Sequence, residues 1–298
     1  MVLVAGDIMV DVLVLSALRV EEQSRGIMLR PGGSAANTAA WLSYLGCPVT
    51  FVGCVGDDPV GAMLTDELAS YGVQTAIRTI PGAETGAVAV EIGDDGERLM
   101  RSARGANEAL SPDDLAGAAM SDLTAVHLTG YALLGPYGFD ILTGAAEITA
   151  GARAQLSFDP SSTGVIGRVG VDAFVAALER CQVHLFLPNL PEASALTGMA
   201  TAEDAAAMLA RRVPRVIVKD AAAGAVWSDG RRTERVPIEP LTPVDSTGAG
   251  DAFNAGALAV LEGGDSLADA CRAAHRAAVR TILRYGGRPP LSLSRPAR

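Results

Sequence analysis

The sequence predicts an α/β fold, and three observations favour this class. The chain has 298 residues, of which 49% are hydrophobic, so it can bury a large core. Only 4% of the residues are aromatic, and small aliphatic side chains suit helices packed on a sheet better than an aromatic-rich β-sandwich. Short β-branched runs also alternate with alanine-rich stretches along the chain.

The alternation of strands and helices begins at the N-terminus. Residues 2–5 and 49–55 are short apolar runs typical of buried strands. Alanine-rich stretches at residues 34–45 and 60–71 are typical of helices. Four more strands are expected at residues 125–128, 154–158, 183–187 and 215–218. Strands separated by helices pair in parallel through crossover connections, so we expect a central parallel sheet with helices on both faces.

Two stretches break this alternation. Residues 11–30 and 85–104 are predicted to be extended without an intervening helix, and the sequence GDDG at residues 93–96 is typical of a hairpin turn. We expect these stretches to form a small β-sheet outside the main one, placed as a lid. No linker or internal repeat separates the parts, so residues 1–298 are expected to form a single domain with this appended lid.

Charge and cysteine content narrow the possible partners. The formal net charge is −10 and we find no basic stripe, which disfavours binding to nucleic acid. The four cysteines have neither zinc-ligand nor disulfide-framework spacing, so free thiols in a reducing cytoplasm are expected. The chain opens directly into an apolar run, without a basic leader or a long apolar span. A cytoplasmic protein that does not use the membrane is therefore expected.

The segment DSTGAGDAFNAG at residues 245–256 carries the strongest chemical signal. It begins in a glycine-rich turn and runs into an alanine-rich helical stretch. Glycines 248 and 250 remove Cβ atoms that would keep an anion from the backbone, and a helix start offers unpaired N–H groups. The turn is therefore a candidate phosphate site, with Asp251 placed to act as base for a substrate hydroxyl.

The same segment also has a simpler interpretation. Glycine-rich turns before helices are common, so the turn can be only a tight loop and Asp251 only an acid favoured by the helix dipole. Two other nucleotide-binding classes are disfavoured. The chain lacks the GxxxxGK[ST] sequence of a P-loop enzyme, and Gly6 does not begin the GxGxxG pattern of a dinucleotide-binding dehydrogenase.

Three segments together resemble the ribokinase-like (PfkB) carbohydrate kinases. DSTGAGDAF at residues 245–253 is similar to the C-terminal signature of that family, and PGGSAANTA at residues 31–39 is similar to its N-terminal signature. GCVGDDPVG at residues 53–61 is similar to a further family segment. The resemblance covers nearly the whole chain. It implies a three-layer α/β/α fold with a mostly parallel central sheet and a small β-sheet lid, and an ATP-dependent sugar kinase activity.

The resemblance implies a catalytic turn and an acceptor site. Asp251 would be the catalytic base, and the backbone amides of Gly248, Ala249 and Gly250 would stabilise charge on the transferred phosphoryl group, in agreement with the local chemistry. The implied acceptor site consists of Asp7, Asp11, Gly32, Gly33 and Asn37. Carboxylate, amide and bare backbone are groups that a polyhydroxylated ligand needs. Either aspartate can instead be a solvated acid at a strand end.

The resemblance also implies a nucleotide site in the second half of the chain. Asn189 and Glu192 match the Asn-x-x-Glu element of the family, which helps to place hydrated Mg²⁺ and the phosphates of ATP. Without the resemblance they would be a turn and a helix cap. Lys219 corresponds to a nucleotide-contacting position, although a lysine at a strand end is otherwise usually solvated.

The loop after Lys219 departs from the family pattern. Relatives usually have glycine where this chain has Ala221, a change that alanine tolerates if φ is negative there, while Gly224 is retained. His275 aligns with a residue that flanks adenine, although a lone helical histidine is often an ordinary surface or core residue. A K⁺ ion bound by backbone carbonyls is implied beside the anion hole, which would involve Asp245, Thr247 and residues 285–287.

The acceptor is left open by the sequence. Arg101 and Arg104 lie close to the lid and would suit a carboxylated or phosphorylated sugar, because guanidinium binds such anions bidentately. They are equally suited to exposed strand positions. Acceptors of the ribose, fructose or 2-keto-3-deoxygluconate type remain open. A nucleoside is the alternative, which the few aromatic residues near the acceptor segments disfavour.

Two rival classes and the oligomeric state complete the expectations. A ligand-binding regulator without catalysis would not need Asp251 or the pair Asn189 and Glu192, and a nucleotide-dependent oxidoreductase would need a dinucleotide fingerprint. Relatives often dimerise through the lid sheet, so the resemblance implies a homodimer formed by the β-lid. The partners expected are therefore a small-molecule sugar and a second copy of the chain.

Overall fold

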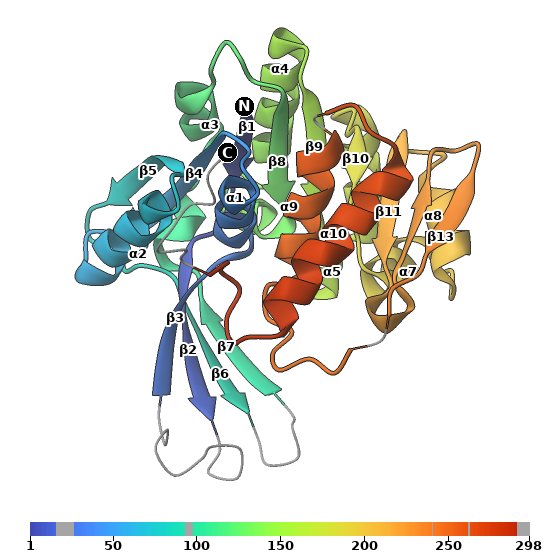
Figure 1. Cartoon of the computed structure of the whole chain (residues 1–298). Helices are drawn as coiled ribbons and strands as arrows, with labels where there is room; N and C mark the ends of the chain where they lie inside the picture. Colours follow the sequence, from blue (N-terminus) through green and yellow to red (C-terminus); the bar gives the residue numbers. More distant parts are fainter. Residues whose placement is uncertain (16–26, 93–97, 240, 262, 291–298) are drawn as a thin grey trace.

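The computed structural model describes residues 1–15, 27–92, 98–239, 241–261 and 263–290, and contains two separate sheets (Figure 1). The hairpin turn predicted at residues 93–96 lies outside the described residues. The larger sheet has nine strands and the smaller has four. The smaller sheet extends from one end of the body, while the N-terminus lies at the other end. The predicted separation of a main sheet and a lid is confirmed.

The nine-stranded sheet forms the middle layer. Every pair of neighbouring strands from β11 to β5 is parallel, and β12 and β13 join antiparallel at one edge. All six strands predicted for this sheet are present, although β10 is shorter than expected. In spatial order the strands are β13 (Thr233–Val236), β12 (Ala225–Ser228), β11 (Arg215–Lys219), β10 (Leu185–Phe186), β9 (Gln155–Asp159), β8 (Ala125–Thr129), β1 (Val2–Ala5), β4 (Val49–Gly56) and β5 (Gln74–Ile80).

Helices cover both faces of this sheet, because its strands are apolar on both sides. In β1, Val2 and Val4 pack in one core and Leu3 and Ala5 in the other. The first core includes α1 (Ser34–Tyr44), α2 (Pro59–Ser70), α9 (Ala249–Leu261) and α10 (Leu267–Ile282). The second includes α3 (Pro112–Ala118), α4 (Asp140–Ala152), α5 (Thr163–Val169), α6 (Val171–Arg180), α7 (Leu190–Thr197) and α8 (Ala202–Leu209).

The lid sheet has two chemically different faces. Its spatial order is β3 (Ile27–Gly32), β2 (Met9–Leu15), β6 (Ala87–Ile92) and β7 (Arg98–Ala103). Asp11 pairs with Arg30 and Val88, so these three side chains share one face, which we call the inner face. The opposite, outer face carries Val12, Leu29, Ala89 and Arg101, which are paired in turn across the sheet.

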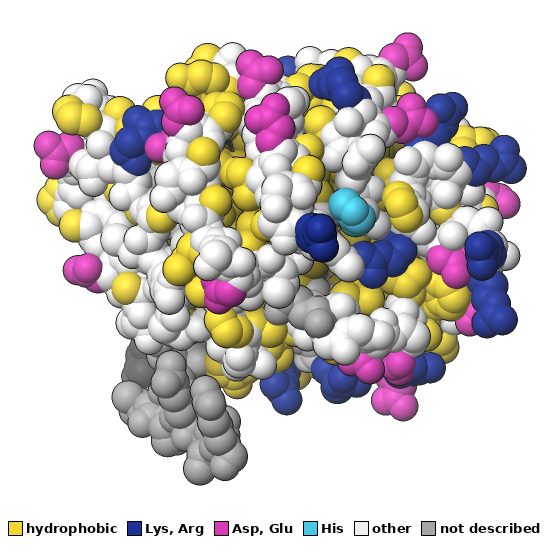
Figure 2. Space-filling model, turned by 90° about the horizontal axis from the view of Figure 1, so that it is seen from above, with side chains coloured by type: hydrophobic (Ala, Val, Ile, Leu, Met, Phe, Trp, Pro, Cys, Tyr) yellow, Lys and Arg dark blue, Asp and Glu magenta, His cyan; other side chains and the backbone are white. Residues whose placement is uncertain are grey.

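The parallel strands end at the side of the body from which the lid emerges (Figure 1). Polar residues at or just after these ends therefore meet at one edge, as is usual for ligand sites in α/β sheets. On the face that Figure 2 shows, basic and acidic side chains are interspersed rather than gathered in a stripe of one sign. Among the described residues, no helix has the length and apolar character needed to cross a membrane.

Candidate active site

A glycine turn leads into α9 at the centre of the candidate site. Gly248 has φ of +73°, and a Cβ atom there would overlap Cα of Gly287, so the position requires glycine. The helix begins at Ala249. The N–H groups of Gly250 and Asp251 have no acceptor within the described part of the chain. Because N–H groups and the dipole at a helix start attract anions, the turn is suited to hold a phosphoryl group.

Asp251 lies in the first turn of α9, with both carboxylate oxygens bonded to α1. Its Oδ1 accepts from Oγ of Ser34 at 2.7 Å, and its Oδ2 accepts from Nδ2 of Asn37 at 2.7 Å. Burial raises the pKa of Asp251 to about 7; the two hydrogen bonds oppose this rise, and the carboxylates of Asp159 and Asp7 add to it. A base with this pKa can accept a proton near neutral pH.

Asn37 is held by Arg288, a residue for which no role is predicted from the sequence. Nη1 of Arg288 donates to Oδ1 of Asn37 at 2.7 Å and Nη2 donates to the carbonyl of Gly32 at 3.2 Å. Its Nε pairs with Glu67 at 3.3 Å, and the side chain is buried. Because Oδ1 of Asn37 accepts from an arginine, its Nδ2 must face Asp251. Arg288 therefore fixes which way the Asn37 amide points.

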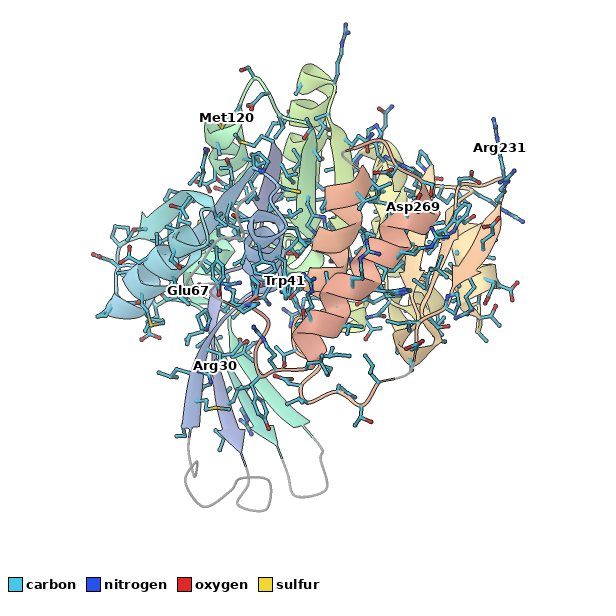
Figure 3. The ribbon with its side chains drawn as sticks, in the orientation of Figure 1. Arg30, Trp41, Glu67, Met120, Arg231 and Asp269 are labelled. Atoms are coloured by element: carbon cyan, nitrogen blue, oxygen red, sulfur yellow. The ribbon has the colours of Figure 1, made fainter. Side chains whose placement is uncertain are left out.

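The C-terminal segment around Gly287 closes the back of the glycine turn. Nε1 of Trp41 donates to the carbonyl of Gly287 at 2.9 Å, and the N–H of Gly286 donates to Oδ2 of Asp245 at 2.9 Å. Oδ1 of Asp245 accepts from the N–H and hydroxyl groups of Thr247, at 2.9 Å and 2.7 Å. Figure 3 shows Trp41 on α1, close to α9 and above the root of the lid. The side chain of Asp245 thus ties the turn at 245–247 to residues 285–287, where the K⁺ site is expected.

Asp7, predicted for the acceptor site, caps α1. Its carboxylate accepts from the N–H groups of Ser34 at 3.0 Å and Ala35 at 3.3 Å, and from Oγ1 of Thr129 at 3.2 Å. Gly33 occupies the N-cap position and has no side chain to do this, so Asp7 supplies the missing acceptor from the connection between β1 and β2. Gly33 has φ of +92°, which is a glycine conformation.

Asp11 lies on the inner face of the lid against Gly32. A Cβ atom on Gly32 would overlap the Asp11 carboxylate, so the absence of a side chain at Gly32 makes room for this carboxylate. Burial raises the pKa of Asp11 to about 6, with Arg288 opposing the rise. No described residue donates a hydrogen bond to this carboxylate, which leaves its oxygens available to ligand hydroxyl groups. The structure does not bring Arg101 to this place, because Arg101 lies on the outer face of the lid.

A cavity of about 750 Å³ lies between α10, the glycine turn and the ends of β9 and β11. One wall is apolar, with Ala278, Val279 and Ile282 following His275 along α10. The other end is polar and contains the glycine turn. A volume of this size with an apolar wall and a phosphate-binding end suits a nucleotide. The cavity brings together these predicted residues: Asn189, Glu192, Lys219, Gly224, Gly248, Ala249, Gly250, Asp251 and His275.

A buried charge cluster lies beneath the glycine turn. Nζ of Lys219 pairs with Oδ2 of Asp159 at 2.7 Å and donates to Oδ1 of Asn254 at 3.2 Å. Burial alone would raise the pKa of Asp159, but the ammonium group and the hydrogen bonds outweigh it, so the pKa is lowered. The ammonium group lies 3.7 Å from the place of a Cβ on Gly250. Lys219 therefore puts a positive charge directly beside the anion-binding turn.

Asn189 and Glu192 form a capping box at the start of α7. The N–H of Glu192 donates to Oδ1 of Asn189 at 2.9 Å, and the N–H of Asn189 donates to Oε2 of Glu192 at 2.8 Å. Burial raises the pKa of Glu192 to about 7, Asp159 adds to the rise, and Lys219 opposes it. The pair is therefore a helix cap, which is the simpler interpretation of its sequence. It also lines the cavity, as a residue pair of a nucleotide site would.

The oxygen-rich wall of the cavity fits a magnesium ion. Asp159 and Glu192 offer two carboxylates and Asn189 an amide, which are the ligand types that this hard ion prefers. The described residues contain no group of three or more His, Cys, Asp and Glu that could enclose a metal. In phosphoryl-transfer enzymes a magnesium ion is usually held by one or two protein carboxylates together with water and the phosphates of the nucleotide.

His275 and the loop at residues 221–224 form the far end of the cavity. His275 is buried and meets the ring of Phe253 edge-on, with 5.5 Å between ring centroids. Burial lowers its pKa, which favours the neutral ring. Gly224 has φ of +94°, and a Cβ there would overlap the carbonyl of Val236. Ala221 has φ of +44°, so the negative φ that would make alanine a neutral replacement for glycine is not found.

Several important residues carried no prediction from the sequence. Ser34 lies inside the PGGSAAN segment, and Asp159 directly follows the strand predicted at residues 154–158, so both are next to segments that the sequence singled out. Asn254 lies one turn after Asp251 in the same glycine-rich motif. Arg288 stands in a segment with no periodic pattern. Its importance rests on contacts with residues that are more than 200 positions away in sequence.

Comparison with known proteins identifies the family. The pfkB family of carbohydrate kinases matches residues 1–293. The chain belongs to this family, as the resemblance of its three segments predicted. Its members with known names include both sugar and nucleoside kinases, so the chain is a kinase of the sugar and nucleoside class.

Individual relatives support this placement. Ribokinase from Bacillus subtilis is 26% identical over 86% of this chain and 82% of the relative, and an ATP-dependent ribose-1-phosphate kinase from Halopiger xanaduensis is 31% identical over 76% and 72%. Adenosine kinase from Sinorhizobium meliloti superposes with a TM-score of 0.88 at 28% identity, covering 97% of this chain and 95% of the other. An E. coli ribokinase II in complex with ATP and Mg²⁺ superposes with a TM-score of 0.83 at 25% identity, covering 96% and 94%. The predicted ribokinase-like fold is confirmed.

The conformation of Ala221 yields a stability prediction. An L-residue in the left-handed region is strained by about 1 kcal/mol, and glycine is not. We expect Ala221→Gly to raise the free energy of unfolding by up to about this amount, reduced by the extra freedom glycine gives the unfolded chain. Denaturant unfolding measures the change. The matched control is Ala222→Gly, at a neighbouring position without positive φ, which should destabilise; equal losses for both variants would show that Ala221 is unstrained.

Proposed function

We propose that this protein transfers the γ-phosphoryl group of ATP to a hydroxyl group of a small sugar or sugar derivative, with Asp251 as general base. The proposal rests above all on the position of the Asp251 carboxylate. It lies at the start of α9, next to N–H groups suited to a phosphoryl group, and it is held by Ser34 and Asn37. A base and an anion site are therefore side by side, as in-line phosphoryl transfer requires.

The nucleotide would occupy the 750 Å³ cavity with its base toward His275 and its phosphates toward the glycine turn. Lys219 and the N–H groups of Gly250 and Asp251 would stabilise negative charge on the phosphoryl group. Asn189, Glu192 and Asp159 would help to hold a magnesium ion, which neutralises phosphate charge when bound. The superposition on a kinase in complex with ATP and Mg²⁺ supports both ligands.

The acceptor would bind between the inner face of the lid and the start of α1. Asp11 would accept hydrogen bonds from acceptor hydroxyl groups. The Asp251 carboxylate would take the proton from the reacting hydroxyl group of the acceptor. The oxygen of that hydroxyl group would bond to the γ-phosphorus while the bond between the γ-phosphorus and the ADP oxygen breaks. The lid would shield the site from water, so that ATP is not hydrolysed. A nucleoside acceptor is the alternative, and the superposition on an adenosine kinase favours keeping it.

The role of Asp251 is tested by Asp251→Asn. We expect turnover to fall by about 10² to 10⁴-fold, because the amide cannot accept the proton, while the fold and ATP binding persist. A coupled ADP-release assay measures turnover over sugars and nucleosides, and calorimetry measures ATP binding. Near-normal turnover in this variant would exclude Asp251 as the base.

The pH dependence of the wild-type enzyme is a second test of Asp251 as general base. The base must be ionised, and its pKa is raised to about 7 by burial, so kcat/KM should rise with pH and level off above about 7. Ser34→Ala removes a hydrogen bond that favours the carboxylate, so it should shift the midpoint to higher pH. A profile that is flat from pH 5 to 8 would contradict this assignment.

We also propose that K⁺ binds to backbone carbonyls of Asp245, Thr247 and residues 285–287. The Asp245 side chain joins these two turns, so a cation there would stiffen the turn that holds the phosphoryl group. Replacing K⁺ with tetramethylammonium should lower kcat and also lower the thermal unfolding midpoint, because an ion that binds only the folded state stabilises it. Equal kcat in both salts would exclude activation by the ion.

A homodimer formed through the outer face of the lid completes the proposal. Ile27 and Leu29 are 67% and 59% exposed, and Leu29 shares this face with Val12 and Ala89. An exposed apolar face of a sheet is a common protein contact surface. Leu29→Asp should give a monomer in sedimentation experiments, whereas Met208→Asp on α8 should leave the oligomeric state unchanged. A wild-type monomer at micromolar concentration would refute the dimer.

A further inference from the structure

Arg104 stands at the junction of the lid and the body. It follows β7 and precedes the short 3₁₀ helix η2 (Gly105–Ala109). Asn107 fixes its place, because Nδ2 of Asn107 donates both to the carbonyl of Arg104 at 2.9 Å and to the carbonyl of Ile8 at 3.0 Å. Oδ1 of Asn107 accepts from the N–H of Ile8 at 2.9 Å. Arg104 is therefore held beside the backbone that joins Asp7 to the first lid strand.

The guanidinium group of Arg104 lacks a protein partner. Its Nε is buried and has no hydrogen-bond partner, and the side chain forms no salt bridge with any described residue. The Arg104 side chain is half-buried, a cation withdrawn from water is costly unless it is paired, and burial lowers the pKa of Arg104. Asp7 and Glu108 are near enough to interact electrostatically, but neither forms a salt bridge with Arg104, and the oxygens of Asp7 already accept from Ser34, Ala35 and Thr129.

A second cation is close to the first. Arg168, in the last turn of α5, is near enough to Arg104 for their like charges to oppose each other. The two arginines bring positive charge to the root of the lid, near the carboxylates of Asp7 and Glu108, on a chain whose net charge is −10. Tyr131 links this region to the reaction centre, because it interacts electrostatically with Arg104 and also with Asp7 and Asp251. Arg104 is not among the residues that line the nucleotide cavity, and it lies beside the segment that carries Asp7.

We propose that the acceptor of this kinase carries an anionic group, a phosphate or a carboxylate, and that the guanidinium group of Arg104 binds it while Arg168 adds positive potential. This inference rests on the proposed function. A guanidinium group offers two parallel N–H donors, which match the oxygens of either anion. Asp11 then binds the hydroxyl groups of the acceptor, while Arg104 binds its anionic group. The similarity to a ribose-1-phosphate kinase agrees with this acceptor class.

Matched acceptors test the proposal in the full-length enzyme. The phosphate arm compares ribose 1-phosphate with ribose, and the carboxylate arm compares 2-keto-3-deoxygluconate with 2-deoxyglucose, all by ADP release. We expect kcat/KM for the anionic member of at least one arm to exceed that of its neutral partner by about 100-fold or more. The arm that shows the preference identifies the anion. Neutral acceptors that equal or surpass both anionic ones would overturn the proposal.

Substitution of Arg104 tests the residue itself. Arg104→Gln should raise KM for the preferred anionic acceptor by about 100-fold, with a smaller effect on kcat, and Arg104→Lys should fall between this variant and the wild type. The matched control is Arg101→Gln, on the outer face of the lid, which should retain the preference. A preference that is unchanged in Arg104→Gln would overturn the role of Arg104.

A binding measurement separates this proposal from the proposed function. Calorimetry on Asp251→Asn measures acceptor binding without turnover, using ribose 1-phosphate and 2-keto-3-deoxygluconate as probes. Binding that disappears in the double variant with Arg104→Gln supports the anion site even if the wild type shows no ADP release, which would refute only the kinase proposal. If neither anionic probe binds while ribose does, the anion site is refuted and the kinase proposal stands.

Discussion

The site depends on the close contact between α1 and α9. Ser34, Asn37 and Asp251 have short side chains, so their 2.7 Å hydrogen bonds form only if the two helices lie very near each other. Alanines make this possible, because Ala35, Ala36, Ala252 and Ala255 are fully buried in the shared core. Gly256 serves the next contact, since a Cβ there would press on the backbone of α10. The alanine-rich composition therefore has a geometric consequence: it lets the base reach its two hydrogen-bond donors.

Helix N-termini stabilise the negative charges of the several carboxylates that lie close together in the site. Asp7 accepts from the first N–H groups of α1, Glu192 caps α7, and Asp251 lies in the first turn of α9. Each acid is placed where the helix dipole favours negative charge. Burial, together with repulsion from Asp159, still raises the pKa values of Asp251 and Glu192 to about 7. Lys219 and Arg288 offset part of this negative charge, and a magnesium ion would offset more.

The two faces of the lid divide its tasks. The inner face places Asp11 against Gly32 and toward Arg288, so it belongs to the acceptor side of the site. The outer face is apolar and exposed around Leu29, so it is available to a partner. Arg104 lies at the root of the lid, where Gly105 approaches the carbonyl of Glu84 closely enough to exclude any side chain. The residues proposed to recognise the acceptor therefore lie where the lid joins the body.

The sequence by itself determined the α/β class, the separate lid and the glycine turn at the start of α9, because periodicity and glycine spacing are local properties. Through the resemblance of separate motifs to one family, the sequence also assigned residues from Asn189 to His275 to a single nucleotide site. Tertiary structure alone decided the partners of each group: Arg288 orients Asn37, Asp159 pairs with Lys219, and strand register turns Arg101 away from Asp11. It also showed that Ala221 has positive φ. Such features depend on which distant segments meet, and a strand register that differs by one residue reverses every side chain, so no local pattern encodes them.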